Sequence, residues 1–176
     1  MDRFESFISE EEIKQKVKQI AAKISSDYEG ESLFVIGVLT GAFIFTADLV
    51  RELTVDVEGI DFIQISSYQG DRSTGNFVFK KDISSDISGK NILLVEDIID
   101  TGRTLKKLKE MLLTRNPRSI KICTACDKPS RRVTELVPDY NCFTIPDKFI
   151  VGYGLDYDGV YRDFKDIRIV RPENEQ

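Results

Sequence analysis

The chain has 176 residues, of which 41% are hydrophobic, so the sequence predicts one globular domain that buries most of its surface on folding. Its formal net charge of −5 gives no general attraction to nucleic acid or anionic lipid, and any phosphate site must therefore be built locally. The sequence contains no histidine, which excludes a Ser-His-Asp triad, a histidine general base and histidine metal ligands.

The first segment of the chain has the pattern of an amphipathic helix. Residues 9–12 match a capping box, and apolar residues then recur at helical spacing: Ile13, Val17, Ile20 and Ile24. No apolar run typical of a signal peptide precedes this helix, and the longest apolar stretch, 33–45, is too short to span a bilayer. We therefore expect a cytoplasmic protein that does not bind membranes.

Two β-α-β units are predicted from apolar strands that alternate with helical spacing. Their segments, in chain order, are a strand at 33–38, a helix at 42–53, a strand at 62–66, a strand at 91–95, a helix marked by Leu105, Leu108 and Leu112, and a strand at 119–126. Further short strands are expected at 76–79, 140–144 and 167–170. A crossover between parallel strands should be right-handed. The sequence therefore predicts an α/β fold with a mostly parallel, twisted sheet flanked by helices.

Between the two units, residues 67–76 are polar and contain two glycines. This stretch lies between two strand-like runs, and we interpret it as a long hairpin loop. Long loops without structure of their own often act as lids, which makes Ser67 and Tyr68 candidates to close over a site. A solvated hairpin tip is the alternative interpretation.

The motif with the most reactive and ligand-binding groups follows the strand at 91–95. Glu96, Asp97 and Asp100 lie at its carboxyl end, the edge at which open α/β sheets bind ligands. Residues 101–104 begin the next helix with backbone N–H groups, hydroxyls and a positive dipole end, which suit a phosphate. Because a phosphate site usually avoids carboxylates, we interpret the acids as partners of sugar hydroxyls, of Mg²⁺ or of a proton in transit. The alternative is that Asp100 or Thr101 merely caps the helix and the other acids are solvated.

Other candidates lie at the ends of neighbouring segments. Residues 39–41 would offer a second set of N–H groups at the same edge, or form a simple turn. Lys128 directly follows a strand, although an isolated lysine is more often solvated. Phe149 would stack on a planar ligand or belong to the core. Asp156 and Arg162 lie in a segment rich in tyrosine and glycine that would line a pocket wall or form a surface ion pair.

Cys123 and Cys126 have the CxxC spacing of redox and zinc sites. They lie within an apolar strand, where the alternation of side chains sends positions three apart to opposite faces, and no second pair or histidine completes a zinc set. We therefore predict that these two residues and Cys142 are buried structural thiols.

Residues 96–104 resemble the signature loop of the purine phosphoribosyltransferases. Segments elsewhere resemble the hypoxanthine-guanine branch of that family and occur in the same order: 39–41, 66–68, 73–75, 127–129, 145–149 and 151–157. The resemblance spans residues 38–172 and implies a type I phosphoribosyltransferase fold in a single domain, 1–176. The core would comprise about 33–145, and a small hood would be made from the N-terminal helix and the segment 146–172.

The resemblance implies transfer of ribose 5-phosphate from phosphoribosyl pyrophosphate (PRPP) to a 6-oxopurine, with release of pyrophosphate. Asp100 would accept the proton from purine N7, while Glu96 and Asp97 would face ribose hydroxyls that chelate Mg²⁺. Asp156 would reach a second Mg²⁺ largely through water. The 5-phosphate would be held by Asp100, Thr101, Gly102, Arg103 and Thr104.

The resemblance also implies where the other parts of the substrates bind. The pyrophosphate would be bound by Leu39, Thr40, Gly41 and Arg162. The purine would be bound by Lys128 at O6, by stacking on Phe149, and by Ile150 and Asp156. A cis peptide is expected between Leu39 and Thr40. Many relatives carry Lys or Arg where this chain has Thr40, so one cation is missing from the pyrophosphate loop.

Three hypotheses for the activity remain open at the level of the sequence. The first is an enzyme specific for hypoxanthine and guanine, and the second is a relative that also accepts xanthine. Adenine is disfavoured, because its 6-amino group would repel the ammonium of Lys128. The third is a non-catalytic regulator that senses PRPP and binds nucleic acid, against which the negative net charge argues. We expect small-molecule substrates, no nucleic acid partner, and the homodimer or homotetramer that the family implies.

Overall fold

The computed structural model of the chain describes residues 3–67 and 77–171. Its elements, in chain order, are β1 (Phe4–Ile8), α1 (Glu10–Asp27), β2 (Ser32–Leu39), α2 (Phe43–Glu52), β3 (Asp56–Ser67), β4 (Phe77–Lys81), β5 (Asn91–Ile99), α3 (Arg103–Leu113), β6 (Ser119–Asp127), the short 3-10 helix η1 (Pro129–Arg131), β7 (Tyr140–Thr144), β8 (Ile150–Val151) and β9 (Ile167–Val170). Each predicted segment contains a helix or a strand, although β3 begins earlier and β5 ends later than predicted. Within the described ranges, no helix is both long and apolar enough to cross a membrane.

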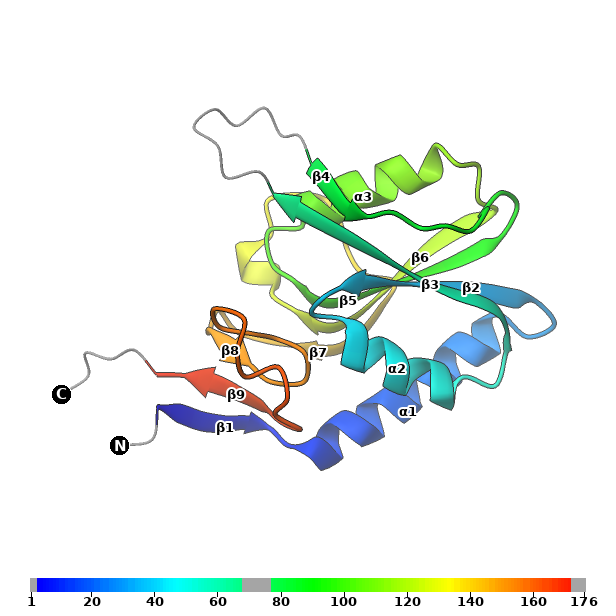
Figure 1. The fold of residues 1–176 in the computed structure, drawn as a ribbon. Helices are drawn as coiled ribbons and strands as arrows, with labels where there is room; N and C mark the ends of the chain where they lie inside the picture. The colour runs from blue at the N-terminus through cyan, green and yellow to red at the C-terminus, as the bar shows by residue number, and fades with distance from the viewer. Residues whose placement is uncertain (1–2, 68–76, 172–176) are drawn as a thin grey trace.

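Six strands form one large sheet in the order β4-β3-β2-β5-β6-β7. The strands β3, β2, β5, β6 and β7 run parallel, and β4 pairs with β3 in the antiparallel sense. Helices α1 and α2 cover one face of this sheet and α3 covers the other (Figure 1). The predicted α/β class, with a mostly parallel sheet between helices, is confirmed.

Two hydrophobic cores lie on the two faces of the large sheet. Leu33 and Val35 of β2 belong to the core that α1 and α2 cover, whereas Phe34 and Ile36 belong to the core that α3 covers. Successive side chains of a strand point to opposite faces, so a strand buried on both faces needs an apolar residue at every position. This burial explains the continuous apolar runs in the sequence.

A second, smaller sheet brings the two ends of the chain together in the order β1-β9-β8 (Figure 1). Both pairings are antiparallel. The N-terminal part of this sheet is the strand β1, which the sequence analysis did not predict. Helix α1 packs against the helix α2 and against β7 of the large sheet. The strand is short and shows no apolar alternation, and its partner lies at the other end of the chain, so no local pattern marks it.

The three cysteines are free and buried, as predicted. Burial raises the pKa of the Cys142 thiol to about 12 and raises the pKa values of Cys123 and Cys126 as well. A thiol held in its neutral form is a poor nucleophile and a poor metal ligand. The CxxC spacing is therefore structural in this fold.

Asp61 of β3 is a buried carboxylate that ties β3 to β4 and to the segment that follows β4. It is 8% exposed. Its Oδ1 accepts hydrogen bonds from Lys81 Nζ at 2.8 Å and Phe62 N at 2.7 Å, and its Oδ2 accepts from Ser84 N at 2.8 Å. Burial by itself would raise the pKa of Asp61, but the Lys81 ammonium and these N–H groups lower it well below the ordinary value. The ionised form is thus the one that the fold stabilises.

We expect Asp61→Asn to lower the free energy of unfolding at pH 7 by about 1.5–3 kcal/mol, the usual range for hydrogen bonds to a charged group. Because the folded-state pKa lies below the unfolded value of about 3.9, the contribution of Asp61 is present above that pH and is lost as the pH falls. Urea unfolding at pH 7 and near pH 3 measures the difference, with Asp56→Asn, an exposed position on the same strand, as control. A difference that stays constant or grows on acidification would contradict this assignment.

Candidate active site

Three adjacent parallel strands place the candidate residues at one edge of the large sheet. The turn at residues 39–41 follows β2, the acidic segment ends β5, and Lys128 follows β6. Because β2, β5 and β6 are neighbours and run in the same direction, their carboxyl ends meet at the same edge. The structure therefore brings these three sequence segments together, as expected for a ligand site in an open α/β sheet.

The acids Glu96 and Asp97 belong to β5 itself, which corrects the prediction that they lie in a loop. The strand continues to Ile99, and Glu96 lies opposite Thr124 of β6. The apolar run in the sequence stops at Val95, so hydrophobicity alone ends the strand too early, whereas pairing with β6 extends it. As a result, the backbone of both acids is held by the sheet.

Glu96 and Asp97 form an acidic pair that is partly buried. Asp97 N donates to Glu96 Oε1 at 3.1 Å, and Ile98 N donates to Asp97 Oδ1 at 2.6 Å. Burial, together with the neighbouring charge of Asp97, raises the pKa of Glu96 well above its ordinary value. Burial also raises the pKa of Asp97, although hydrogen bonds and the Arg162 cation oppose that rise. A cation or a set of hydroxyl donors would relieve this repulsion.

The acidic pair fits Mg²⁺ only if other ligands complete the shell. Among the residues that the structure describes, no three Asp, Glu, His or Cys side chains gather closely enough to hold a metal ion. Mg²⁺ often binds through one or two carboxylates and takes its remaining ligands from water and substrate phosphates. The donor set therefore suits a site that forms together with the substrate.

Gly41 lies directly against the carboxylate of Asp97. A Cβ atom added at Gly41 would lie 1.6 Å from Asp97 Oδ2, and one added at Gly154 would lie 2.1 Å from the carbonyl oxygen of Gly41. Three segments thus meet at Gly41: the end of β5 through the Asp97 carboxylate, the turn after β2, and the segment after β8 through the backbone of Gly154. The peptide bond between Leu39 and Thr40 is cis, as the resemblance implied.

Arg162 and Asp156 meet beside Gly154. Arg162 Nη1 donates to the carbonyl of Gly154 at 2.6 Å, and its Nη2 lies 2.9 Å from Asp156 Oδ1. Asp156 Oδ2 accepts from Gly159 N at 2.7 Å. Because Gly154 packs on the turn at 39–41, the ion pair of Arg162 and Asp156 lies beside that turn.

The candidate phosphate site lies at the N-terminus of α3. Gly102 precedes the helix with φ +79°, and Thr101 Oγ1 accepts from Arg103 N at 3.5 Å. The first turn of α3 contains no acidic residue, so its N–H groups and its dipole remain favourable to an anion. Thr104 is exposed in the same turn.

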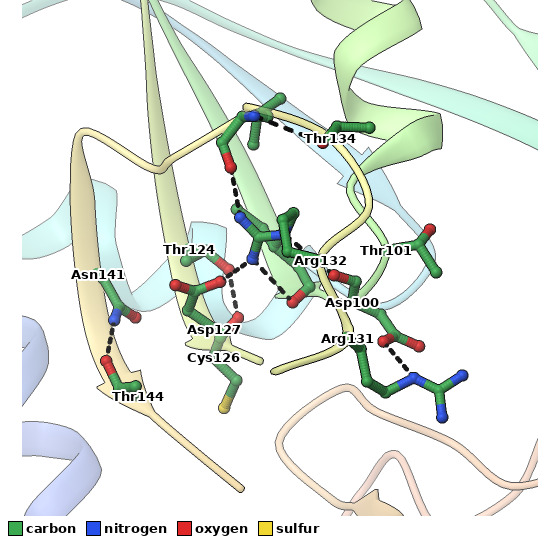
Figure 2. A network of polar contacts seen from close by, with 12 residues as sticks. Asp100, Thr101, Thr124, Cys126, Asp127, Arg131, Arg132, Thr134, Asn141 and Thr144 are labelled. Carbon is green, nitrogen blue, oxygen red and sulfur yellow. Dashed lines mark hydrogen bonds and ion pairs between the residues drawn. The ribbon is translucent and has the colours of Figure 1, made fainter. Parts of the chain in front are cut away.

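Arg132 fixes the backbone of this loop and was missed by the sequence analysis. Its Nε donates to the carbonyl of Asp100 at 3.0 Å and its Nη2 to the carbonyl of Ile99 at 3.4 Å, while the guanidinium forms an ion pair with Asp127 (Figure 2). The Arg132 side chain is 10% exposed. A buried arginine in a loop leaves no periodic signal, and only its position five residues after the acid that ends β6 hints at the pair.

The candidate purine-binding residues Lys128, Phe149 and Ile150 form a group that we call the purine wall. Lys128 follows β6, Phe149 immediately precedes β8, and Ile150 begins it. Lys128 is 7% exposed, and its Nζ donates to the carbonyl of Lys148 at 2.6 Å, so it is not a solvated surface lysine. Phe149 is 51% exposed and contacts Tyr157 edge to face at 5.4 Å, so it is not a core residue. Ile150 is buried in β8. Of the lid candidates, Ser67 ends β3, and Tyr68 lies outside the described residues.

Comparisons with known proteins point in one direction. The family model described as phosphoribosyl transferase domain matches residues 6–158. A hypoxanthine-guanine phosphoribosyltransferase of Streptococcus pneumoniae is 44% identical over 167 residues, which cover 94% of this chain and 92% of that protein. A solved hypoxanthine-guanine phosphoribosyltransferase of Bacillus anthracis is 46% identical with a TM-score of 0.92, covering 97% of this chain and 100% of the other. A hypoxanthine phosphoribosyltransferase of Staphylococcus aureus is 39% identical with a TM-score of 0.91, covering 98% and 94%.

The contact between Gly154 and Gly41 can be tested against a matched glycine. Gly30 also has a positive φ, of +78°, but has open space around it. We expect Gly30→Ala to lower the free energy of unfolding by about 1–2 kcal/mol, the cost of a left-handed backbone. Gly154→Ala should cost about 1–3 kcal/mol more, because the new methyl group would overlap the Gly41 carbonyl. Urea titrations compare the two variants, and equal losses would show that the close packing is absent.

Proposed function

The chain belongs to the phosphoribosyl transferase domain family, among the hypoxanthine-guanine phosphoribosyltransferases, and from this premise we propose which residues carry out its reaction. The enzyme acts in purine salvage: it transfers the 5-phosphoribosyl group of PRPP to hypoxanthine or guanine and releases pyrophosphate. The observation that supports the residue assignments most strongly is the stack of Asp97, Gly41 and Gly154, with Arg162 beside it. This stack joins the acidic end of β5 to the turn after β2.

PRPP would bind along the carboxyl edge of β2 and β5. The 5-phosphate would accept hydrogen bonds at the N-terminus of α3, from residues Asp100, Thr101, Gly102, Arg103 and Thr104. The ribose hydroxyls would face Glu96 and Asp97. The pyrophosphate would lie on the turn of Leu39, Thr40 and Gly41, where the Arg162 cation lies close to the Gly154 carbonyl.

Mg²⁺ would be held by Glu96 and Asp97 through the ribose, with Asp156 as a further carboxylate that acts largely through water. When bound, the ion would neutralise charge on the pyrophosphate and on the acidic pair. The raised pKa values of Glu96 and Asp97 support this assignment, because a nearby cation stabilises the ionised forms of two partly buried, neighbouring carboxylates.

The purine would lie between the acidic end of β5 and the purine wall. Lys128 would donate to O6, Phe149 would stack on the ring with its exposed face, and the backbone of Ile150 together with Asp156 would contact the far edge. The buried Lys128 Nζ is already held by the Lys148 carbonyl, which keeps the ammonium at a fixed position. A fixed donor selects an acceptor at C6 and therefore a 6-oxopurine.

In the reaction, the bond from purine N9 to C1 of the ribose forms as the bond from C1 to pyrophosphate breaks. Positive charge develops on the ribose and negative charge on the pyrophosphate, where Arg162 and the N–H groups of residues 39–41 would stabilise it. The proton on purine N7 goes to Asp100, the general base. Asp100 lies three residues beyond the acidic pair, so the proton and the metal-bearing ribose are handled by different carboxylates.

The remaining assignments rest on the family. We propose a cytoplasmic homodimer or homotetramer that binds small molecules and no nucleic acid. A relative that also accepts xanthine and a regulator that only senses PRPP are the two alternatives.

The function is tested by incubating the purified protein with PRPP, Mg²⁺ and one purine at a time. We expect nucleotide and pyrophosphate with hypoxanthine and guanine, and no product with adenine, because the Lys128 ammonium cannot donate to a 6-amino group. Faster turnover with xanthine would favour the xanthine-accepting alternative. Binding of PRPP without product from any of the four purines would identify a sensor instead.

Asp100→Asn should retain PRPP binding but lower kcat by about 10²- to 10⁴-fold, the usual contribution of a general base. The amide keeps the shape of the side chain but accepts no proton. Steady-state kinetics give kcat, and calorimetry gives the Kd of PRPP, with Asp56→Asn as a control outside the site. An unchanged kcat at neutral pH would exclude Asp100 as the base.

Lys128→Ala should raise the KM for hypoxanthine about ten- to hundredfold, as expected for loss of one hydrogen bond from a charged donor. The KM for PRPP should change far less, because Lys128 lies on the purine wall. Lys148→Ala is the matched control, since it removes an exposed lysine side chain but keeps the carbonyl that Lys128 contacts. A larger effect on PRPP than on the purine would refute the assignment.

A further inference from the structure

The two carboxylate oxygens of Asp100 have different surroundings. Oδ1 is buried, and it lies 2.7 Å from Arg131 Nε (Figure 2). The Asp100 side chain as a whole is 44% exposed. The accessible oxygen of this carboxylate is therefore Oδ2, while Oδ1 faces the arginine.

Arg131 also contacts the segment that leads to the purine wall. Its Nη1 lies 3.5 Å from Asp147 Oδ2. Asp147 immediately precedes Lys148, whose carbonyl holds the Lys128 ammonium, and Phe149 comes next. One guanidinium thus joins the loop that carries the base to the segment that carries the purine contacts.

The backbone around Arg131 is held from both sides. Arg131 is the last residue of η1, and its N donates to the carbonyl of Lys128 at 3.2 Å. The next residue, Arg132, is anchored by its ion pair with Asp127 and by its hydrogen bond to the carbonyl of Asp100. Arg131 therefore reaches both carboxylates from a backbone that its neighbours hold in place.

We propose that Arg131 is a positioning residue for the base Asp100. By binding Oδ1, it orients Oδ2 towards the place where the purine would bind. By binding Asp147, it keeps the base at a fixed position relative to the purine contacts. This inference rests on the proposed role of Asp100 as general base. A simple surface ion pair is the competing explanation, since exposed pairs contribute little to stability.

The two explanations differ in what the loss of Arg131 changes. A surface ion pair would affect stability slightly and turnover not at all. A positioning residue would affect kcat, because a displaced catalytic group can lower the rate by about a hundredfold while binding of PRPP persists. Its effect would also depend on the carboxylate that it positions.

A double-mutant cycle between Arg131 and Asp100 tests this dependence. We expect Arg131→Gln to lower kcat with hypoxanthine about ten- to hundredfold, with little change in the KM for PRPP. In the Asp100→Asn background, the same substitution should have almost no further effect on kcat. An undiminished kcat for Arg131→Gln, or an equal fold-loss in both backgrounds, would overturn the proposal.

Controls separate this proposal from folding defects and from the proposed function. Arg118→Gln removes an exposed arginine that pairs with Glu31, away from the site, and should leave kcat unchanged. If Arg131→Gln lowers the melting temperature, Arg131→Met repeats the cycle with an apolar side chain in place of the amide. A normal kcat for Asp100→Asn alone would overturn the base assignment and the positioning role with it. A low kcat for Asp100→Asn with additive losses would overturn only the role of Arg131.

Discussion

Gly41 lies so close to the carboxylate of Asp97 that no side chain fits at position 41, in the turn after β2. The site depends on this contact. Because Gly41 has no Cβ, the carboxylate of Asp97 can lie against its backbone, and Gly154 packs against the carbonyl of the same residue. The carbonyl of Gly154 then accepts from Arg162, which brings a cation to the acidic edge. A larger residue at position 41 would separate the groups that we propose act on one substrate.

The electrostatics of the edge follow from the same packing. Burial raises the pKa values of Glu96 and Asp97, so positive charge or hydroxyl donors that reach the pair would stabilise the ionised forms. Asp100 is treated differently: its backbone is held by Arg132 and its Oδ1 by Arg131. The sheet therefore separates two carboxylates that would serve a metal-bearing ribose from a third that would accept a proton. That division agrees with a family that transfers a phosphoribosyl group to a purine.

Much of this arrangement could be predicted from the sequence, because it depends on local patterns. Buried parallel strands require continuous apolar runs, and the edge at which they end follows from their direction. What could not be predicted depends on contacts between distant segments. The strand β1 forms only because β9 pairs with it, β5 continues through Glu96 because β6 lies alongside, and Arg132 is buried because Asp127 and the carbonyl of Asp100 meet it. Lys128 was expected to be solvated more often than not, and its burial could be learned only from the structure.

We propose that Mg²⁺ and PRPP together complete the acidic pair at the end of β5. The most direct test is a calorimetric titration of PRPP into the protein, in excess Mg²⁺ and in EDTA, for the wild type and for Asp97→Asn. We predict that removing Mg²⁺ weakens PRPP binding strongly in the wild type and much less in the variant, because the variant has lost the carboxylate that the ion requires. The same dependence on Mg²⁺ in both proteins would contradict the claim.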